Sequence, residues 1–258
     1  MSQKSKDIAI AIPARLNSRR LKNKVLMKFN GLEMIEHVRR RALLNRYDVP
    51  VFVISGDNQI LELINNFGGL CHKTKLHHAN GLSRVAEAMS TLNFSNFVVV
   101  QADEVLIDPE SINILISNVK KNKFDAVNCV TKIKNIQEIK NLNVVKCILD
   151  EEKNILNIFR KSPLISELNI QLNELMKITG LFAFKKFSPT YKKNEFETLL
   201  IKKESIEQLF FLKKSFQFKS LEIKQNWPSV NTKKDYLLCK KILQKNKFQQ
   251  KILRAIDG

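Results

Sequence analysis

The chain contains 258 residues, with 44 Lys and Arg against 25 Asp and Glu, which gives a formal net charge of +19 at pH 7. A hydrophobic content of 44% excludes a disordered chain, and the length suits one large domain or two small ones. No apolar segment approaches the ~20 residues that a membrane span needs, and no secretory signal is visible, so we expect a cytoplasmic protein with no membrane partner. The cysteines lie far apart without a CxxC pair and predict reduced thiols, with no zinc site: Cys71, Cys129, Cys147 and Cys239.

The positive charge is dispersed. The 34 Lys are spread along the whole length, whereas seven of the ten Arg lie within the first 46 residues. Nucleic-acid binders more often concentrate their charge on one tail, helix or stripe with interleaved aromatic residues. We therefore expect no nucleic-acid partner; the alternative, a protein that binds nucleic acid through its net charge, predicts binding that falls steeply with salt.

Apolar segments alternate with helical patterns in the first half of the chain. Residues 7–13 predict a buried strand, residues 14–24 a basic loop, and the apolar stripe after Gly31 a helix. The next expected elements are a strand at 49–55, helices at 58–68 and 82–92, a strand at 97–101, a helix at 109–120 and a strand from 126. This alternation predicts βαβ units, and hence a mostly parallel sheet flanked by helices.

The middle of the chain has a different pattern. Strands are expected at residues 144–150, 155–160 and 180–186, which suggests an inserted antiparallel β lobe at approximately 140–190. A helix at 205–214, a strand at 219–223 and a C-terminal helix at about 232–247 follow. With neither an internal repeat nor a Pro/Gly/Ser-rich linker, we expect residues 1–258 to form a single α/β domain.

Ligands of open α/β sheets bind outside the carboxyl ends of the strands, which directs attention to the loop after the first strand. This loop has no acidic residue and carries five side chains that can donate hydrogen bonds to phosphate: Arg15, Ser18, Arg19, Arg20 and Lys24. An exposed loop in a Lys-rich protein is the alternative, but the scarce Arg favours a site for a polyanion.

A second candidate position follows the apolar strand at 97–101, where Asp103 and Glu104 stand. Mg²⁺ prefers one or two carboxylates together with phosphate oxygens, so Asp103 combined with the cationic loop predicts a site for a nucleotide and Mg²⁺. The sequence has neither GxxxxGK[ST] nor GxGxxG, which argues against P-loop and Rossmann dinucleotide-binding folds.

Eight segments, in order, resemble the cytidylyltransferases that activate acidic sugars, the family of 3-deoxy-manno-octulosonate (Kdo) cytidylyltransferase. The cationic loop, IPARLNSRRLKNKVL at residues 12–26, resembles the family pattern IPAR-x-x-S-x-R-x-x-x-K-x-L. The others are GLEMIEHV (31–38), HANGLSR (78–84), QADEV (101–105), NLNVVK (141–146), FRKSP (159–163), ESIEQL (204–209) and SVNT (229–232). The resemblance covers nearly the whole chain.

The resemblance implies a GT-A-like nucleotidyltransferase fold in which the anomeric hydroxyl of the sugar attacks the α-phosphorus of CTP, with Mg²⁺ as cofactor. It implies Arg15, Lys24 and Asp103 as catalytic residues, a homodimer, and a place in lipopolysaccharide biosynthesis. The implied nucleotide-binding residues are Arg15, Ser18, Arg20, Lys24, Asn80, Gly81, Arg84 and Gln101, of which Gln101 would contact nucleotide or sugar. The implied sugar-binding residues are Arg160, Lys161, Glu207, Gln208 and Asn231, and the implied metal ligands are Asp103 and Asn231.

Several positions depart from the family pattern. Asn231 replaces a metal-binding Asp, so a second Mg²⁺ should bind more weakly, and Ala102 replaces a Gly. Ile178 stands where a His is expected, and Phe182 or Phe184 where a Tyr is expected, which would change how sugar hydroxyls are recognised. These departures leave two alternatives open: an enzyme for another acidic sugar, such as a nonulosonic acid or an amino-Kdo, or a catalytically silent nucleotide-binding homologue.

Overall fold

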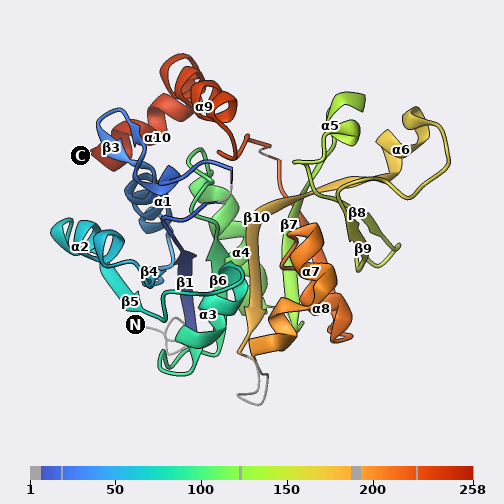
Figure 1. Cartoon of the computed structure of the whole chain (residues 1–258). Helices are drawn as coiled ribbons and strands as arrows, with labels where there is room; N and C mark the ends of the chain where they lie inside the picture. The colour runs from blue at the N-terminus through green and yellow to red at the C-terminus, as the bar shows by residue number, and fades with distance from the viewer. Residues whose placement is uncertain (1–6, 19, 122–123, 187–192, 225, 258) are drawn as a thin grey trace.

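The computed structural model describes residues 7–18, 20–121, 124–186, 193–224 and 226–257. Its centre is a mixed sheet in which strands from both halves of the chain lie in the order β11-β7-β10-β6-β1-β4-β5 (Figure 1). These strands are β1 (Ile8–Pro13), β4 (Val51–Ser55), β5 (Leu70–Lys73), β6 (Asn96–Val100), β7 (Ala126–Lys132), β10 (Met176–Lys185) and β11 (Phe218–Glu222). The pairs β6–β1, β1–β4, β4–β5 and β11–β7 are parallel, whereas β10 runs antiparallel to both β6 and β7.

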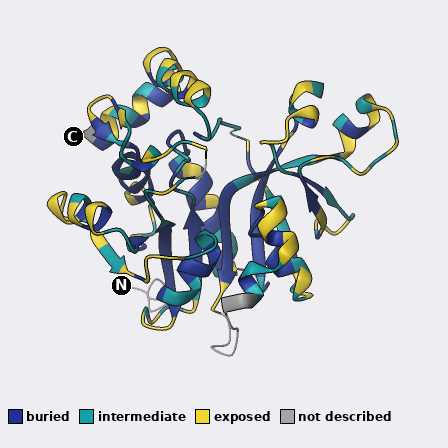
Figure 2. Ribbon diagram, viewed as in Figure 1, coloured by how far each residue is buried: buried dark blue, intermediate teal, exposed yellow. Residues whose placement is uncertain are grey.

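Side chains alternate along β1 because successive residues of a strand point to opposite faces. Ile8, Ile10 and Ile12 pack on the face covered by α1 (Met34–Leu43), α2 (Asn58–Asn66), α4 (Pro109–Lys121) and α9 (Lys233–Lys245). Ala9 and Ala11 pack on the other face, under α3 (Gly81–Met89), α7 (Leu199–Glu204) and α8 (Leu209–Lys213). Figure 2 shows the resulting buried sheet between helices whose outer sides are exposed. The predicted α/β class, a mostly parallel sheet flanked by helices, is confirmed.

A smaller group of elements projects from the β7–β10 side of the sheet (Figure 1). It contains α5 (Ile136–Lys140), β8 (Lys146–Leu149), β9 (Ile155–Phe159) and α6 (Leu168–Glu174). The hairpin of β8 and β9 pairs antiparallel with the first residues of β10, and Ile139, Phe159 and Leu175 form part of a separate small core. We call residues 133–175 the lobe. The expectation of a single domain with an insertion at about 140–190 stays a prediction.

Some boundaries differ from those expected. Residues 205–214 form no single helix: Ser205 has a left-handed backbone (φ 52°) that ends α7, and α8 starts only at Leu209. Strand β10 starts at Met176, four residues earlier than predicted. A second C-terminal helix, α10 (Lys247–Asp257), follows α9, and the short η2 (Lys24–Leu26), β2 (Lys28–Phe29), β3 (Leu32–Glu33) and η3 (Lys193–Glu197) complete the structure. Among the described residues, no helix has the length and apolar character to cross a membrane.

Candidate active site

A cavity of about 800 Å³ opens at the carboxyl ends of β1 and β6, between the central sheet and the lobe. This is the edge at which open α/β sheets bind ligands, and the volume lies in the upper part of the ~300–1,000 Å³ range usual for small-molecule sites. Its walls come from the loop after β1, the start of α3, the segment after β6, the middle of β10, the turn between α7 and α8, and the segment before α9.

The loop after β1 brings its predicted phosphate donors to the cavity. Ala14 N donates to Ile54 O, and Leu16 N donates to the Asp57 carboxylate at 3.1 Å, so the loop is fixed to the neighbouring β4 segment. Leu16 O accepts hydrogen bonds from the backbone of Ser18 and Asn23, which folds the loop back on itself. The predicted residues that line the cavity are Arg15, Ser18, Arg20 and Lys24, whereas Arg19 lies outside the described residues.

Lys24 and Asp103, from the segments after β1 and β6, form an ion pair of 2.5 Å in the cavity wall. Lys24 Nζ also donates to Val230 O at 3.0 Å, and Val230 N donates to Asp103 O, so three distant segments meet here. Asp103 Oδ1 is buried and has no hydrogen-bond partner among the described residues. A buried carboxylate oxygen without a partner is costly unless a ligand satisfies it, so this atom suits a divalent cation.

Arg20 connects the loop to the opposite side of the cavity. Its Nη2 donates to Asn231 Oδ1 at 2.5 Å, and its Nη1 donates to the Asn143 side chain in the lobe. Asn231 precedes Thr232, which caps α9, and its backbone N–H donates to Asp235. The amide oxygen expected to bind a second metal is thus engaged by a guanidinium, which a cation would have to displace.

The predicted base and ribose contacts have structural tasks of their own. Asn80 is the N-cap of α3: its Oδ1 accepts from Ser83 N at 2.9 Å, while its Nδ2 donates to Phe196 O. Gly81 lies against Pro13, since a Cβ at position 81 would stand 3.0 Å from the proline ring. Arg84 is buried and donates to Thr74 Oγ1, Lys75 O and Leu76 O. It supports the segment before α3 and lies outside the lining of the large cavity.

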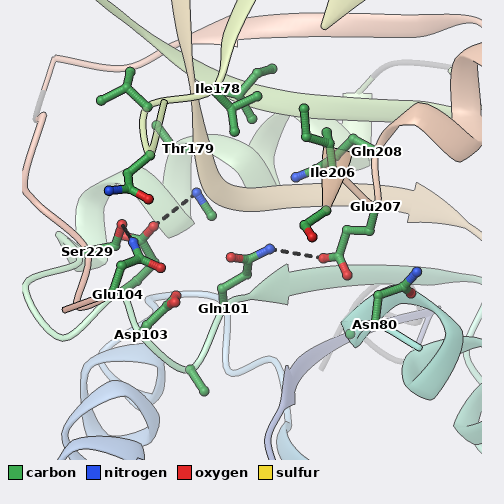
Figure 3. A pocket seen from close by; sticks show the side chains of 18 of the residues that line it. Asn80, Gln101, Asp103, Glu104, Ile178, Thr179, Ile206, Glu207, Gln208 and Ser229 are labelled. Carbon is green, nitrogen blue, oxygen red and sulfur yellow. Dashed lines mark hydrogen bonds between the residues drawn. The ribbon is translucent and has the colours of Figure 1, made fainter. Parts of the chain in front are cut away.

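Gln101, at the end of β6, contacts a predicted sugar-binding residue. Gln101 Nε2 donates to Glu207 Oε1 at 3.0 Å, and Glu207 Oε2 accepts from Leu82 N at 2.9 Å. Figure 3 shows the two side chains pointing toward each other, with Asp103 on the Gln101 side and Asn80 near Glu207. The neighbouring Gln208 donates to Asn128 Oδ1 at 3.4 Å.

The lobe places Arg160 at the cavity but leaves Lys161 outside it. Arg160 uses its three guanidinium nitrogens on backbone carbonyls: Glu204 O at 2.6 Å, Leu142 O at 2.8 Å and Ser205 O at 3.0 Å. Lys161 is exposed and does not line the cavity. Lys146, which the sequence reasoning did not assign to the site, is buried and donates to Asn141 O, Val144 O and Arg160 O. Burial lowers the pKa of Lys146 to about 8, and the Arg160 charge adds to this effect.

Two further lining residues were missed as site residues. The Glu104 carboxylate accepts from Gly180 N at 3.1 Å; burial raises its pKa to about 7, and the neighbouring Asp103 charge contributes. Lys177 opposes this rise, and its Nζ donates to Asn226 Oδ1 at 2.7 Å and lies 3.7 Å from Glu138. Glu104 stood beside Asp103 in the QADEV segment, but nothing in the sequence marked Lys177.

Of the apolar residues that stand where the family pattern has polar ones, one lines the cavity and two lie in the core. Ile178 lines the cavity, so an apolar side chain takes the place of the expected His (Figure 3). Phe182 and Phe184 are fully buried, 6.1 Å apart as a stacked pair in the core below α8, and do not line the cavity. Trp227 lines the cavity and stacks on Phe248 at 6.1 Å.

Comparisons with known proteins agree with this geometry. The cytidylyltransferase family model matches residues 9–234. A 3-deoxy-manno-octulosonate cytidylyltransferase of Chlorobium limicola is 31% identical over 92% of this chain and 97% of its own length. An 8-amino-3,8-dideoxy-manno-octulosonate cytidylyltransferase of Shewanella pealeana is 29% identical over 90% of this chain and 97% of its own length.

A solved structure of CMP:2-keto-3-deoxy-manno-octonic acid synthetase complexed with CTP superposes with a TM-score of 0.82. It is 24% identical and covers 92% of this chain and 98% of the other. This likeness confirms the predicted GT-A-like nucleotidyltransferase fold. The matched family model and the relative above 30% identity together show that this chain belongs to the cytidylyltransferase family of nucleotidyltransferases.

Proposed function

We propose that this protein transfers CMP from CTP to the anomeric hydroxyl of 3-deoxy-manno-octulosonate and releases pyrophosphate. The anomeric oxygen forms a bond to the α-phosphorus, the bond from that phosphorus to the bridging oxygen breaks, and the hydroxyl proton leaves to solvent. The reaction needs no nucleophile from the enzyme. It needs alignment and neutralisation of charge, which positioned cations and a bound metal supply.

The observation that carries the proposal is the Lys24–Asp103 pair in a cavity whose wall also contains Arg15 and Arg20. These three cations, with a carboxylate oxygen that has no partner in the described part of the chain, suit a triphosphate with its metal better than they suit a neutral ligand. We assign triphosphate binding to Arg15, Ser18, Arg20 and Lys24. The start of α3, with Asn80 and Gly81, would lie beside the base and ribose, and Arg84 would hold the preceding segment in place.

Mg²⁺ fits this site, and we assign Asp103 as its protein ligand because Asp103 Oδ1 is buried and none of the described residues bonds it. When bound, the ion would neutralise charge on the phosphate oxygens and polarise the phosphorus. Lys24 would then be free to turn from the carboxylate toward the triphosphate. We expect Asn231 to support a second ion weakly, since its amide oxygen is uncharged and already accepts from Arg20.

We place the acidic sugar on the lobe side of the cavity, near Gln101, Glu207, Gln208 and Asn231. Arg160 would contribute its charge and hold the wall, because its guanidinium already bonds three carbonyls. The assignment of Lys161 to the sugar stays a prediction without support from the cavity lining.

A second candidate substrate is an 8-amino-3,8-dideoxy-manno-octulosonate. Ile178 lines the cavity where a hydrogen-bonding His is expected, and a relative named for this amino sugar is 29% identical to the chain. A changed hydrogen-bonding group in a sugar site changes which hydroxyl or amine is accepted. Kdo remains the main proposal because the relative named for it has the higher identity.

We also propose a homodimer acting in the cytoplasm, in lipopolysaccharide biosynthesis. Exposed apolar side chains on and beside the lobe support a dimer interface: Leu142, Leu156, Ile165, Ile170, Leu199 and Leu200. Light scattering after size exclusion should give a mass near twice 29.8 kDa. A monomer at micromolar concentration would contradict the dimer.

The proposed reaction is tested by incubating the protein with CTP, Mg²⁺ and either Kdo or its 8-amino analogue. Pyrophosphate release is followed continuously, and the CMP-sugar is identified by mass spectrometry. We expect turnover with Kdo, and a higher kcat/KM for the amino sugar would select the second candidate. Release with either sugar would exclude a catalytically silent homologue, whereas its absence with both would overturn the proposal.

A further inference from the structure

Glu207 stands in the turn between α7 and α8 and reaches the start of α3 from outside that helix. Its Oε2 accepts from Leu82 N at 2.9 Å, and the N–H of Gly81 also points at the carboxylate. These are among the first N–H groups of α3, which have no partner inside the helix. Asn80 serves the next one, Ser83 N, at 2.9 Å. Glu207 therefore completes the capping of α3 and is itself fixed, with 8% of its surface exposed.

The second oxygen of Glu207 determines how Gln101 is oriented. Glu207 Oε1 accepts from Gln101 Nε2 at 3.0 Å, while its Oε2 accepts from Leu82 N. Three donors oppose the burial that raises the pKa of Glu207. The amide of Gln101 turns its nitrogen toward Glu207 and its oxygen away from it, the arrangement seen in Figure 3.

Gln101 Oε1 is consequently presented to the cavity as an acceptor, with no hydrogen-bond partner within the described residues. The matching ligand group must be a donor, which excludes phosphate and carboxylate oxygens. The Gln101 side chain lies beside Glu207, in the turn between α7 and α8, and the backbone N–H of Gln101 donates to Gly180 O in the middle of β10. The hydroxyls of a sugar on the lobe side are donors in the right place.

We propose that Glu207 is a positioning residue that fixes the amide of Gln101 so that its oxygen accepts a hydrogen bond from a sugar hydroxyl. This inference rests on the proposed function. It makes recognition of the hydroxyl depend on the direction of a hydrogen bond between two protein side chains. Glu207 acts through Gln101 and the start of α3 rather than by touching the reacting atoms.

The test reverses the hydrogen bond without changing volume. In Glu207→Gln, the amide oxygen of residue 207 still accepts hydrogen bonds from the first N–H groups of α3, and its amino group faces Gln101. Gln101 must then turn its oxygen toward residue 207 and its nitrogen toward the cavity. The nitrogen can only donate, so the sugar hydroxyl loses the acceptor for its proton. A hydroxyl proton left without an acceptor inside the site weakens binding, so we expect the sugar KM to rise roughly 10- to 100-fold. The KM for CTP should change less than about threefold.

The exchanged pair provides the rescue. In the double variant Gln101→Glu with Glu207→Gln, residue 101 accepts from residue 207 and again presents an oxygen to the cavity. We expect its sugar KM to return to within about fivefold of the wild type. Gln101→Glu alone brings two carboxylates together, so its sugar KM should exceed that of both Glu207→Gln and the double variant. Glu110→Gln, which removes an exposed carboxylate paired with Arg46, is the matched control and should behave as the wild type.

The outcomes separate the orientation of Gln101 from a merely structural role. A double variant as impaired in sugar KM as Glu207→Gln alone, or an equal rise in the KM for CTP, would overturn the inference. Side-chain amide signals of Gln101, assigned by their loss in Gln101→Glu, should exchange slowly with solvent in the wild type and faster in Glu207→Gln. Equal exchange would also overturn it. Absence of turnover by the wild type would count against the proposed function instead, and the exchange measurement needs no turnover.

Discussion

Replacing Glu104 by Gln should stabilise the protein at alkaline pH and leave its stability unchanged at acidic pH. Burial, assisted by the Asp103 charge, raises the pKa of the Glu104 carboxyl to about 7, whereas an unfolded chain has the ordinary value near 4.5. Between these values the folded state holds a proton that the unfolded state has lost. Raising the pH therefore favours unfolding across this window, and the effect is complete above about pH 7.

The size of the effect follows from the width of the window. Each pKa unit corresponds to about 1.4 kcal/mol, so the wild type should lose about 2–3 kcal/mol between pH 5 and pH 8 through this group. Gln keeps an oxygen that can accept from Gly180 N, but it carries no charge to bury. The variant should match the wild type at pH 5 and exceed its free energy of unfolding by about 2–3 kcal/mol at pH 8.

Urea unfolding of both proteins at pH 5 and pH 8, without Mg²⁺ or nucleotide, measures the difference directly. Comparing variant with wild type at each pH cancels the titration of all other groups. Glu110→Gln serves as the control, because an exposed ion pair contributes little at either pH. Equal stability of the Glu104 variant and the wild type at pH 8, or the same gap at pH 5, would refute the raised pKa of the Glu104 carboxyl.

Three other substitutions test the site. Asp103→Asn should lower kcat at least ~100-fold while the thermal unfolding midpoint stays near that of the wild type, and wild-type turnover would remove Asp103 as the metal ligand. Arg15→Ala should weaken CTP binding roughly 10-fold in calorimetry, and unchanged affinity would show that the cationic loop is assigned wrongly. Arg84→Ala leaves Thr74 Oγ1, Lys75 O and Leu76 O without their donor, so denaturant unfolding should show a loss of about 1–3 kcal/mol. A stability equal to that of the wild type would mean that Arg84 does not brace this segment.

The fold was predictable where local pattern and tertiary packing agree. The apolar run of β1 and the stripe of α1 each carry their own periodicity, so their types and approximate bounds followed from the sequence. The helix predicted at residues 205–214 was wrong. The left-handed backbone of Ser205, together with the hydrogen bonds from Arg160 to Glu204 O and Ser205 O, replaces helical hydrogen bonds with tertiary ones. Nothing in the sequence of residues 205–214 predicts hydrogen bonds from the distant Arg160.

The two sides of the candidate site differ in the same way. The cationic loop is contiguous, so one short segment of sequence displays Arg15, Arg20 and Lys24 together. The side proposed for the sugar is assembled from residues far apart in the chain, and its central feature is a break in the pairing of β10 with β7 between Ile178 and Phe182. At this break Gly180 directs its N–H to Glu104 and its carbonyl to Gln101 N. Such a bulge depends on the partner strand and leaves no mark in the periodicity of β10 itself.

Three of the cations assigned to the candidate site are already partnered before any ligand arrives, which changes the meaning of the net charge. Lys24 bonds Asp103 and Val230 O, Arg20 bonds two side-chain amides, and Arg160 bonds three carbonyls. An incoming triphosphate must replace these partners. The free energy that it gains at each cation is therefore the difference between the new bond to phosphate and the bond that is broken. Arg15 differs from these three, since its hydrogen bond to His78 O is long at 3.5 Å. Arg15 therefore gives up least on meeting an anion, and the placement of a single weakly engaged guanidinium matters more for nucleotide binding than the dispersed lysines that make up most of the charge.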